Sequence, residues 1–404
     1  PAMEEDFPSL ANSSVEQGIF TAAILLGALI GSAFASGISK VFNKKRSIFI
    51  SGIVTAIGSL LCAFLPYLSL ILLSRELVGV AVGIISVICP VYVSELAPRR
   101  FSGALGSWFQ VALTFGILLS YLSNLIFADI IYSFRWMFGL GAIPGILLSA
   151  MYFVMPMAPS DVDATYMKSV QKYTQKDKAT GVKMYVEIVK TQKKGILLSI
   201  VLAATLQFTG INAVLYYAPT IFSNAGFSGS SASLLASLGV GFWNFLSTFV
   251  AIFLVDRAGR RPLLIGGLSI MMISVVILGF VFQFLINISQ TAAGIMSIIF
   301  LFSYITGFEA GIGSLFWPLL TETFPAEYRN AGASMGNVLQ WSFNILLSSL
   351  FPFLIDYFSQ GIVFWGFGVV CFLTLVFLFF QMPETKESSE VNNVIGSSEF
   401  DANV

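Results

Sequence analysis

Long apolar runs separated by short polar stretches dominate the pattern of hydrophobic positions along this chain. A helix needs about 20 apolar residues to cross a bilayer core of about 30 Å. Backbone groups in lipid must be paired within their own segment, and no alternation typical of membrane β-strands is visible. The pattern therefore predicts eleven membrane-spanning helices, at 17–38, 47–66, 71–93, 103–127, 135–156, 195–222, 231–255, 262–286, 292–321, 331–355 and 361–382.

The basic residues lie almost entirely in alternate loops between these spans. Of the 21 lysines and arginines, 19 fall on one side of the predicted membrane, and only Arg75 and Arg135 lie elsewhere. Loops rich in basic residues face the cytoplasm. The lysine-rich segment 157–194, which separates five spans from six and has helical spacing in part, is therefore predicted to be cytoplasmic, as is the tail 383–404.

Two N-x-Ser sequons agree with this orientation. They begin at Asn12 and Asn287, in segments 1–16 and 286–292, which the charge pattern places outside. A sequon is a short motif that often occurs by chance, but both fall on the side where glycosylation takes place. Asn12 and Asn287 are therefore candidate glycosylation sites.

The composition narrows the class of protein. Hydrophobic residues make up 56% of the 404 residues and charged residues only 10%, whereas a soluble domain carries about 25% charged residues. The chain has no histidine, and its 3 cysteines each lie in an apolar run. Histidine catalysis is therefore excluded, and neither a disulfide framework nor a cysteine metal site is expected. The chain is predicted to lie in the lipid bilayer, to bind no nucleic acid, metal or cofactor, and not to be an enzyme.

Polar side chains recur at helical spacing inside several apolar runs. The stripes consist of Ser107, Gln110, Thr114 and Tyr121; Ser237, Asn244 and Thr248; Glu309, Gly313 and Trp317; and Gln340, Asn344 and Ser348. One stripe by itself is typical of hydrogen bonding between packed helices. Several stripes rich in neutral amides favour a central polar cavity instead.

The chemistry of these side chains suits an uncharged ligand with several hydroxyls. An amide offers a donor and an acceptor together, which matches a sugar or polyol, whereas an ionic substrate would require a fixed counter-charge. Glu309 is a carboxylate deep within a run, and Gln207 and Asn212 add two amides. These amides are about 140° apart on an ideal helix, so they converge only if the helix is broken, for which Gly210 is suited.

Several motifs spread over nearly the whole chain are highly specific in combination. They are Pro90 to Glu95 followed by Gly103 to Gly106 with Gln110, Phe134 to Gly139 with Pro144, Gln207 to Tyr217, Asp256 to Arg261, Phe308 to Gly313 with Trp317, and Pro383 to Lys386. This set resembles the sugar porter branch of the major facilitator superfamily, which contains the facilitative glucose transporters.

The resemblance implies an all-α polytopic membrane fold made of two pseudo-symmetric bundles of six helices. Residues 1–156 would form the N-terminal bundle and residues 195–382 the C-terminal bundle, joined by the cytoplasmic loop 157–194 and followed by the tail 383–404. Eleven of the twelve expected helices are then present, and the sequence is expected to lack the first one.

The resemblance also implies which residues contact the sugar. It assigns this role to Gln110, Gln207, Asn212, Asn244, Trp317 and Asn344, with Phe308, Glu309 and Trp341 near them. Charged residues at the cytoplasmic helix ends are candidates for a gate that clamps one conformation, with simple anchoring to the membrane face as the alternative. These residues are Glu95, Arg99, Arg100, Asp256, Arg257, Arg260, Arg261, Glu322 and Arg329.

Departures from the family pattern change the expectations. Leu206 stands where the family has the first of two adjacent glutamines, which removes one expected sugar contact. Segment 40–45 has lost the family's acid, and segment 156–160 lacks its glutamate and arginine. The cytoplasmic ion network of the N-terminal bundle is therefore expected to be depleted.

The sequence thus predicts a multi-pass protein, placed in the plasma membrane, that carries a hexose such as glucose by alternating access. Transport would be facilitated or proton-coupled. A polyol or inositol transporter of the same fold and a non-transporting sugar sensor are the alternatives. The short tail after residue 382 counts against the sensor, because a sensor would be expected to carry a long cytoplasmic signalling segment.

Overall fold

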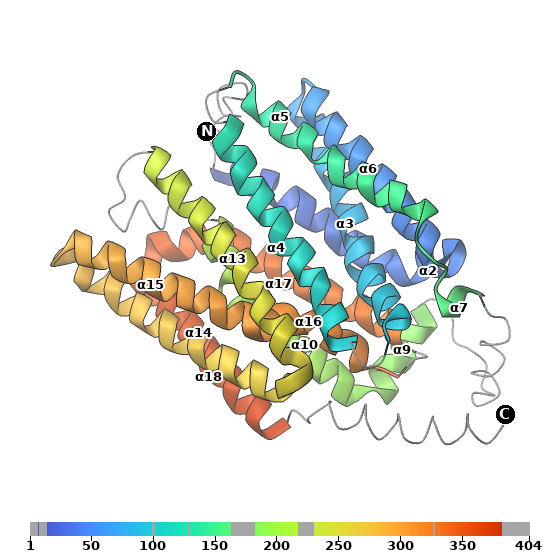
Figure 1. Cartoon of the computed structure of the whole chain (residues 1–404). Helices are drawn as coiled ribbons and strands as arrows, with labels where there is room; N and C mark the ends of the chain where they lie inside the picture. The colour runs from blue at the N-terminus through green and yellow to red at the C-terminus, as the bar shows by residue number, and fades with distance from the viewer. Residues whose placement is uncertain are drawn as a thin grey trace.

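The computed structural model describes residue 7 and residues 14–98, 102–127, 130–162, 182–216, 230–325 and 328–381 of the chain. The regular secondary structure of these residues is helical throughout. Three helical groups follow one another along the chain: the N-terminal helices α2 to α6, a short connector, and the C-terminal helices α10 to α18 (Figure 1).

The N-terminal helices are α2 (Ser14–Phe64), α3 (Leu68–Leu96), α4 (Ser102–Phe127), α5 (Ser133–Leu140) and α6 (Ala142–Ala150), followed by the 3-10 turn η2 (Met151–Phe153). Helix α2 is broken at Asn43, whose backbone has φ 57° and ψ 166°. This combination of a positive φ with an extended ψ is rare for residues other than glycine. The Asn43 side chain accepts a hydrogen bond from the Arg46 amide at 2.9 Å and so caps the second half of α2.

The connector contains α7 (Pro159–Val162) and α9 (Val182–Thr191). The C-terminal helices are α10 (Lys193–Phe208), α11 (Ile211–Tyr216), α13 (Ser230–Ala258), α14 (Arg260–Gln283), α15 (Gln290–Phe308), α16 (Ser314–Glu322), α17 (Arg329–Phe358) and α18 (Gln360–Gln381). A 3-10 turn, η3 (Leu285–Asn287), precedes α15, and a π-helical segment, η4 (Glu309–Gly313), joins α15 to α16.

Eight helical stretches of the described residues are long and apolar enough to cross a membrane. The first, Gly18–Phe64, covers two of the predicted spans because α2 continues through the break at Asn43. The predicted span 195–222 is split at Gly210 into α10 and α11, and the predicted span 331–355 lies in α17. The expectation of a membrane protein built of helices is confirmed.

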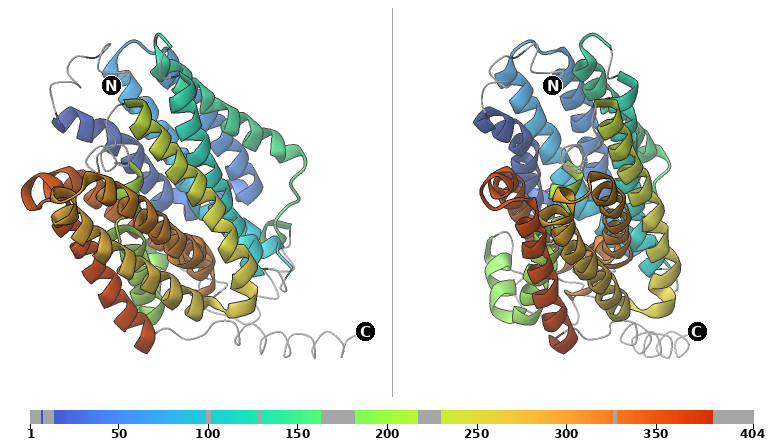
Figure 2. Two further views of the ribbon diagram at one scale, coloured as in Figure 1. Left: turned by 60° about the vertical axis from the view of Figure 1, so that its left-hand side comes forward. Right: turned by 90° about the vertical axis from the view of Figure 1, so that its left-hand side faces the viewer.

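The N-terminal and C-terminal helices meet most extensively along two pairs. Helix α4 packs against α13, and α2 packs against α17. In both views of Figure 2 the yellow helix α13 runs beside the blue-green helix α4, so residues more than a hundred positions apart face each other along this seam.

Close backbone packing joins α2 to α3. Gly27 and Gly31 on α2 and Gly79 and Gly83 on α3 each lie where an added Cβ would collide with a backbone carbonyl of the other helix. Small residues four apart allow membrane helices to approach this closely. The α2–α3 pair therefore depends on the absence of side chains at these positions.

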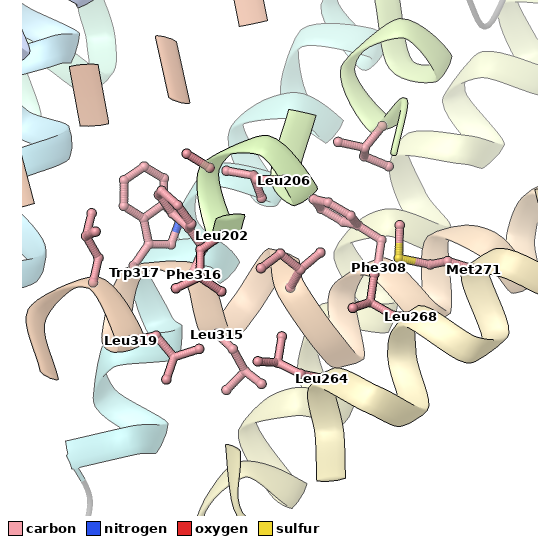
Figure 3. Close-up of a cluster of buried hydrophobic side chains, with 14 of the residues drawn as sticks. Leu202, Leu206, Leu264, Leu268, Met271, Phe308, Leu315, Phe316, Trp317 and Leu319 are labelled. Atoms are coloured by element: carbon pink, nitrogen blue, oxygen red, sulfur yellow. The ribbon is translucent and has the colours of Figure 1, made fainter. Parts of the chain in front are cut away.

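The buried apolar core is largest among the C-terminal helices. Figure 3 shows leucines of α10, α14 and α16 interlocking, with Phe308 and Trp317 at the edges of the cluster. Leu206, which replaces an expected glutamine, belongs to this core with 8% of its surface exposed. The core holds α10, α14 and α16 together, and two of these helices carry the predicted site residues Gln207 and Trp317.

The predicted orientation can be tested with a matched pair of exposed positions. Val41 is 75% exposed beside the break in α2 at Asn43, on the predicted cytoplasmic side, and Ile288 is 80% exposed between η3 and α15, on the predicted outer side. A membrane-impermeant thiol reagent applied to intact cells is expected to label Ile288→Cys and to label Val41→Cys only after permeabilisation, because charge asymmetry sets the orientation. Labelling of Val41→Cys in intact cells would contradict the orientation.

Candidate functional site

A buried carboxylate joins the N-terminal helices to the C-terminal helices near the middle of the molecule. The Gln110 amide nitrogen on α4 lies 3.2 Å from both carboxylate oxygens of Glu309, and the Trp317 indole nitrogen donates to the Gln110 oxygen at 3.2 Å. Thr248 on α13 donates to Glu309 at 3.4 Å. The Glu309 side chain is fully buried, so neutral donors from two helices hold its oxygens.

The π-helical segment η4 gives Glu309 its position. Gly311 within it has φ −109° and ψ −113°, which interrupts the helix between α15 and α16. Such single-turn widenings are rare and are frequent at functional sites. Gly313, one turn later, leaves room for the Phe308 ring and a Glu309 oxygen, which a Cβ at this position would meet at 2.6 and 3.1 Å. The local fold therefore turns the carboxylate toward α4 and α13.

A second group of predicted residues forms a chain of amides. Asn212 on α11 donates to the Gln207 oxygen at 2.6 Å, and the Gln207 nitrogen donates to the Gln340 oxygen on α17 at 2.6 Å. Gly210, at φ 97°, breaks the helix between the first two residues. The two amides converge for the reason expected from the sequence, since only a broken helix brings positions five apart onto one side.

Three further predicted residues lie outside these two groups. Both polar atoms of Asn244 are buried without a hydrogen-bond partner, as is the indole nitrogen of Trp341. Asn344 accepts a hydrogen bond from Ser348 at 2.9 Å on the same helix. Buried polar groups are rarely left without partners, so Asn244 and Trp341 have hydrogen-bonding capacity for a ligand or for water.

Six of the nine predicted sugar-contacting residues thus lie in these two groups or directly beside them. The structure also adds three residues to the candidate site. Thr114, Thr248 and Gln340 all hydrogen-bond within these groups or beside them. Each belongs to a polar stripe visible in the sequence, which is the signal that could have assigned them to the site.

The family profile described as "Sugar (and other) transporter" matches residues 2–390 of the chain. This chain belongs to that family. Two relatives are a D-xylose transporter of Levilactobacillus brevis, 34% identical over 93% of this chain and 86% of the relative, and the glucose transporter GlcP of Staphylococcus epidermidis, 33% identical over 93% and 87%.

A solved structure has the same fold. It is the major facilitator superfamily proton:xylose symporter XylE bound to 6-bromo-6-deoxy-D-glucose, with a TM-score of 0.80, 27% identity, and coverage of 95% of this chain and 90% of XylE. The chain is therefore a sugar transporter of the major facilitator fold, an integral multi-pass membrane protein and not an enzyme. The resemblance to sugar porters drawn from the sequence motifs is confirmed.

On the predicted cytoplasmic side, α2, α3 and the connector helix α7 hold a cluster of three charges. The Lys44 ammonium group lies 3.1 Å from Glu95 and 3.9 Å from Asp161, and the Lys44 backbone amide donates to Asp161 at 2.9 Å. The Lys44 side chain is only 4% exposed. The expectation of a depleted network was wrong here, because Asp161, just beyond segment 156–160, supplies an acid that the motif comparison missed.

This charge cluster is expected to stabilise the protein. Lys44→Met leaves two partly buried carboxylates without their cation, which we expect to cost about 2 kcal/mol, between the values typical of exposed and of buried pairs. Lys45→Met is the matched control. Lys45 lies over the Tyr152 ring at 4.6 Å, and this cation–π contact contributes less stability than the ion pairs of Lys44. The stability of both variants is measured by thermal unfolding in detergent, which is monitored as the loss of monodisperse protein. Equal shifts for the two variants would contradict a special role for Lys44.

The C-terminal helices hold the second part of the predicted gate. Arg260 pairs with Glu322 at 3.2 Å, and Arg261 donates to the Phe379 carbonyl oxygen at 2.6 Å. Arg257 is exposed, and the Nε of Arg329 is buried without a hydrogen-bond partner. Arg99, Arg100 and the side chain of Asp256 lie outside the described part of the chain. The Lys44–Glu95 and Arg260–Glu322 pairs therefore each join two helices of one group, whereas Asp161 links Lys44 to the connector helix α7.

The connector helix α9 touches both groups of helices. The Tyr185 hydroxyl donates to the Ala33 carbonyl oxygen on α2 at 3.3 Å, and the Tyr328 hydroxyl donates to Glu187 at 3.1 Å. Gly106 on α4 lies directly against Pro318 on α16, where a Cβ would come within 2.9 Å of the proline ring. In this structure the two groups of helices are therefore in contact on the predicted cytoplasmic side.

The two sequon asparagines differ in what the structure describes. Asn287 is exposed in η3, between α14 and α15, and Asn12 lies outside the described residues. Exposure of Asn287 is what glycosylation requires, and its modification stays a prediction.

Proposed function

We propose that this protein carries a monosaccharide across the plasma membrane by alternating access. The observation that supports this most is the pair of polar groups around Gln110–Glu309 and Asn212–Gln207–Gln340 in an otherwise apolar molecule. The N-terminal helices and the C-terminal helices would be the two bundles that rock about this site. Residues 157–194 would connect them on the cytoplasmic face.

Neutral amides support a sugar as the substrate. The two groups present four amide side chains and one carboxylate, and Asn244 and Trp341 have unpaired polar atoms that a hydroxylated ligand would satisfy. The Trp317 and Phe308 rings offer apolar surfaces to the C–H face of a sugar ring. Millimolar binding requires only about −4 kcal/mol, which a few neutral hydrogen bonds provide while still allowing release.

A hexose such as glucose is the first candidate substrate, and a pentose is the second. GlcP is named for glucose, and the relative from Levilactobacillus brevis is named for D-xylose. Polyols such as inositol suit the same amide chemistry. XylE is named as a proton symporter, so uptake by this chain is proposed to be either facilitated or driven by protons.

Uptake into liposomes containing the purified protein tests this proposal. We expect labelled glucose to enter by counterflow, with unlabelled xylose and inositol as competitors that rank the substrates. A protonophore separates the two modes, because it abolishes accumulation by a symporter and leaves counterflow intact. Sugar binding without any counterflow would favour a sensor and contradict transport, and the absence of both would contradict a sugar site.

A further inference from the structure

A hydroxyl pair bridges the N-terminal and C-terminal helices beside the carboxylate. The Thr114 oxygen on α4 lies 3.1 Å from the Thr248 oxygen on α13. Neither side chain has any exposed surface. Because α4 and α13 belong to different groups of helices, this bond crosses the seam that alternating access would have to deform.

Both hydroxyls can take part in the bridge and remain satisfied. Each has one proton to donate and two lone pairs to accept with. Thr114 also lies 3.1 Å from the Gln110 carbonyl oxygen, and Thr248 lies 2.9 Å from the Asn244 carbonyl oxygen. If either threonine is replaced, the remaining hydroxyl can therefore donate to its own helix, and no unpaired buried group is created.

The bridge shares residues with the site. Thr248 donates to Glu309 at 3.4 Å, and Thr114 follows Gln110 by one helical turn on α4. The Gln110–Glu309 contact and the threonine bridge therefore join the same two groups of helices side by side. Both contacts use α4, so both depend on the position of this helix.

Apolar side chains lie on the predicted outer side of the bridge. The next turns of α4 and α13 toward the predicted outer side enclose a groove of about 550 Å³ whose lining includes Phe115, Leu118 and Phe242. Toward the cytoplasm, Gly106 lies against Pro318. A hydrogen bond in such surroundings is electrostatically stronger than the same bond in water.

We propose that the Thr114–Thr248 hydroxyl bridge is a positioning element of the transport cycle, which holds Glu309 beside Gln110 and favours the arrangement in which the cytoplasmic side is closed. This inference rests on the proposed function, because it assigns a role within alternating access. Loss of the bridge is expected to shift the population toward a form that is open to the cytoplasm. Thr114→Val nearly keeps the shape of threonine and removes the bridge together with the contacts of this hydroxyl to carbonyl oxygens of its own helix.

A second hydroxyl pair in the same protein provides the control. Thr205 on α10 donates to Thr374 on α18 at 3.2 Å, and both side chains are buried. Both helices belong to the C-terminal group, so this bond lies within one bundle and is not deformed when the two bundles rock. Its removal by Thr205→Val or Thr374→Val tests what the loss of any buried hydroxyl does.

The first measurement is a distance that does not depend on sugar transport. Spin labels on Phe42→Cys, beside the break in α2 at Asn43, and on Ala258→Cys, at the end of α13, report the opening of the predicted cytoplasmic side, where both positions are exposed. The native cysteines Cys62, Cys89 and Cys371 are replaced by alanine. In Thr114→Val we expect the ratio of long to short distances to rise about fivefold, the effect of one net hydrogen bond.

The second measurement is a double-mutant cycle on glucose counterflow. Thr114→Val, Thr248→Val and the double variant are compared, and a direct bridge requires that the double variant differ from the product of the single effects by about fivefold. Thr114→Ser keeps the hydroxyl and is expected to restore the wild-type distance distribution. Thr248→Val serves as the second test if Thr114→Val does not fold.

Several results would overturn the proposed role of the hydroxyl bridge. An unchanged distance distribution in both valine variants, an equal shift in Thr205→Val, or strictly multiplicative effects in the cycle would each show that the hydroxyls only fill space. Failure of the proposed function is a different outcome, because wild-type protein would then show no counterflow while the distance measurement could still be made.

Discussion

Replacing Gln207 by alanine will weaken sugar uptake roughly 5- to 150-fold in apparent affinity, because losing one partner in a buried polar site costs about 1–3 kcal/mol. Gln207 is the middle member of the amide chain, donating to Gln340 and accepting from Asn212. Its removal leaves both neighbours without their partner and takes away a donor and an acceptor from the ligand. Initial rates of labelled glucose uptake over a range of concentrations measure the effect.

The control for this prediction is another glutamine of the same protein. Gln283 near the end of α14 accepts a hydrogen bond from Ser359 at 2.8 Å, and this contact is exposed. Gln283→Ala is expected to leave uptake unchanged, and both variants should reach the membrane in normal amounts. If Gln207→Ala transports like the wild type, the amide chain only joins helices and does not contact sugar.

Replacing Gly31 by alanine will destabilise the pair α2–α3 more than any surface substitution. A Cβ at Gly31 would collide with the backbone carbonyl of Val80, and backbone cannot move aside as a side chain can. Overpacking of this kind costs about 1–3 kcal/mol and occasionally more. We expect a markedly lower temperature for the loss of monodisperse protein in detergent.

Gly37 offers a matched control on the same helix. No atom lies within 4 Å of the place where a Cβ would stand at Gly37. Gly37→Ala is therefore expected to keep or slightly raise stability, since alanine favours helix over glycine by about 1 kcal/mol. If Gly31→Ala and Gly37→Ala unfold at the same temperature, close packing of α2 on α3 is not what stabilises this pair.

The sequence determined the helical membrane architecture, because its cause is local. Hydrophobic length alone predicts a spanning helix, since the bilayer requires about 20 apolar residues whatever their partners. The break at Gly210 was also predicted, because two amides five positions apart cannot face one ligand from a regular helix. The family followed from motifs that the profile match to residues 2–390 confirms.

Other local features were less accessible from the sequence. The predicted span 135–156 is divided into α5, α6 and η2, and α2 runs through two predicted spans with one break at Asn43. Apolar composition reports that a segment can lie in lipid, but not where its backbone departs from a helix. Such departures depend on single residues and on the neighbours against which they pack.

Only the tertiary structure decided which polar residues are hydrogen-bond or ion-pair partners. Helical spacing placed Gln110 and Thr114 on one face of a span and Glu309 on a face of another, but it could not say that the faces meet. The pairing of Lys44 with Asp161 was missed for the same reason, since it joins residues 117 positions apart. Periodicity fixes the direction of a side chain about its own helix, whereas the packing of whole helices fixes what lies opposite it.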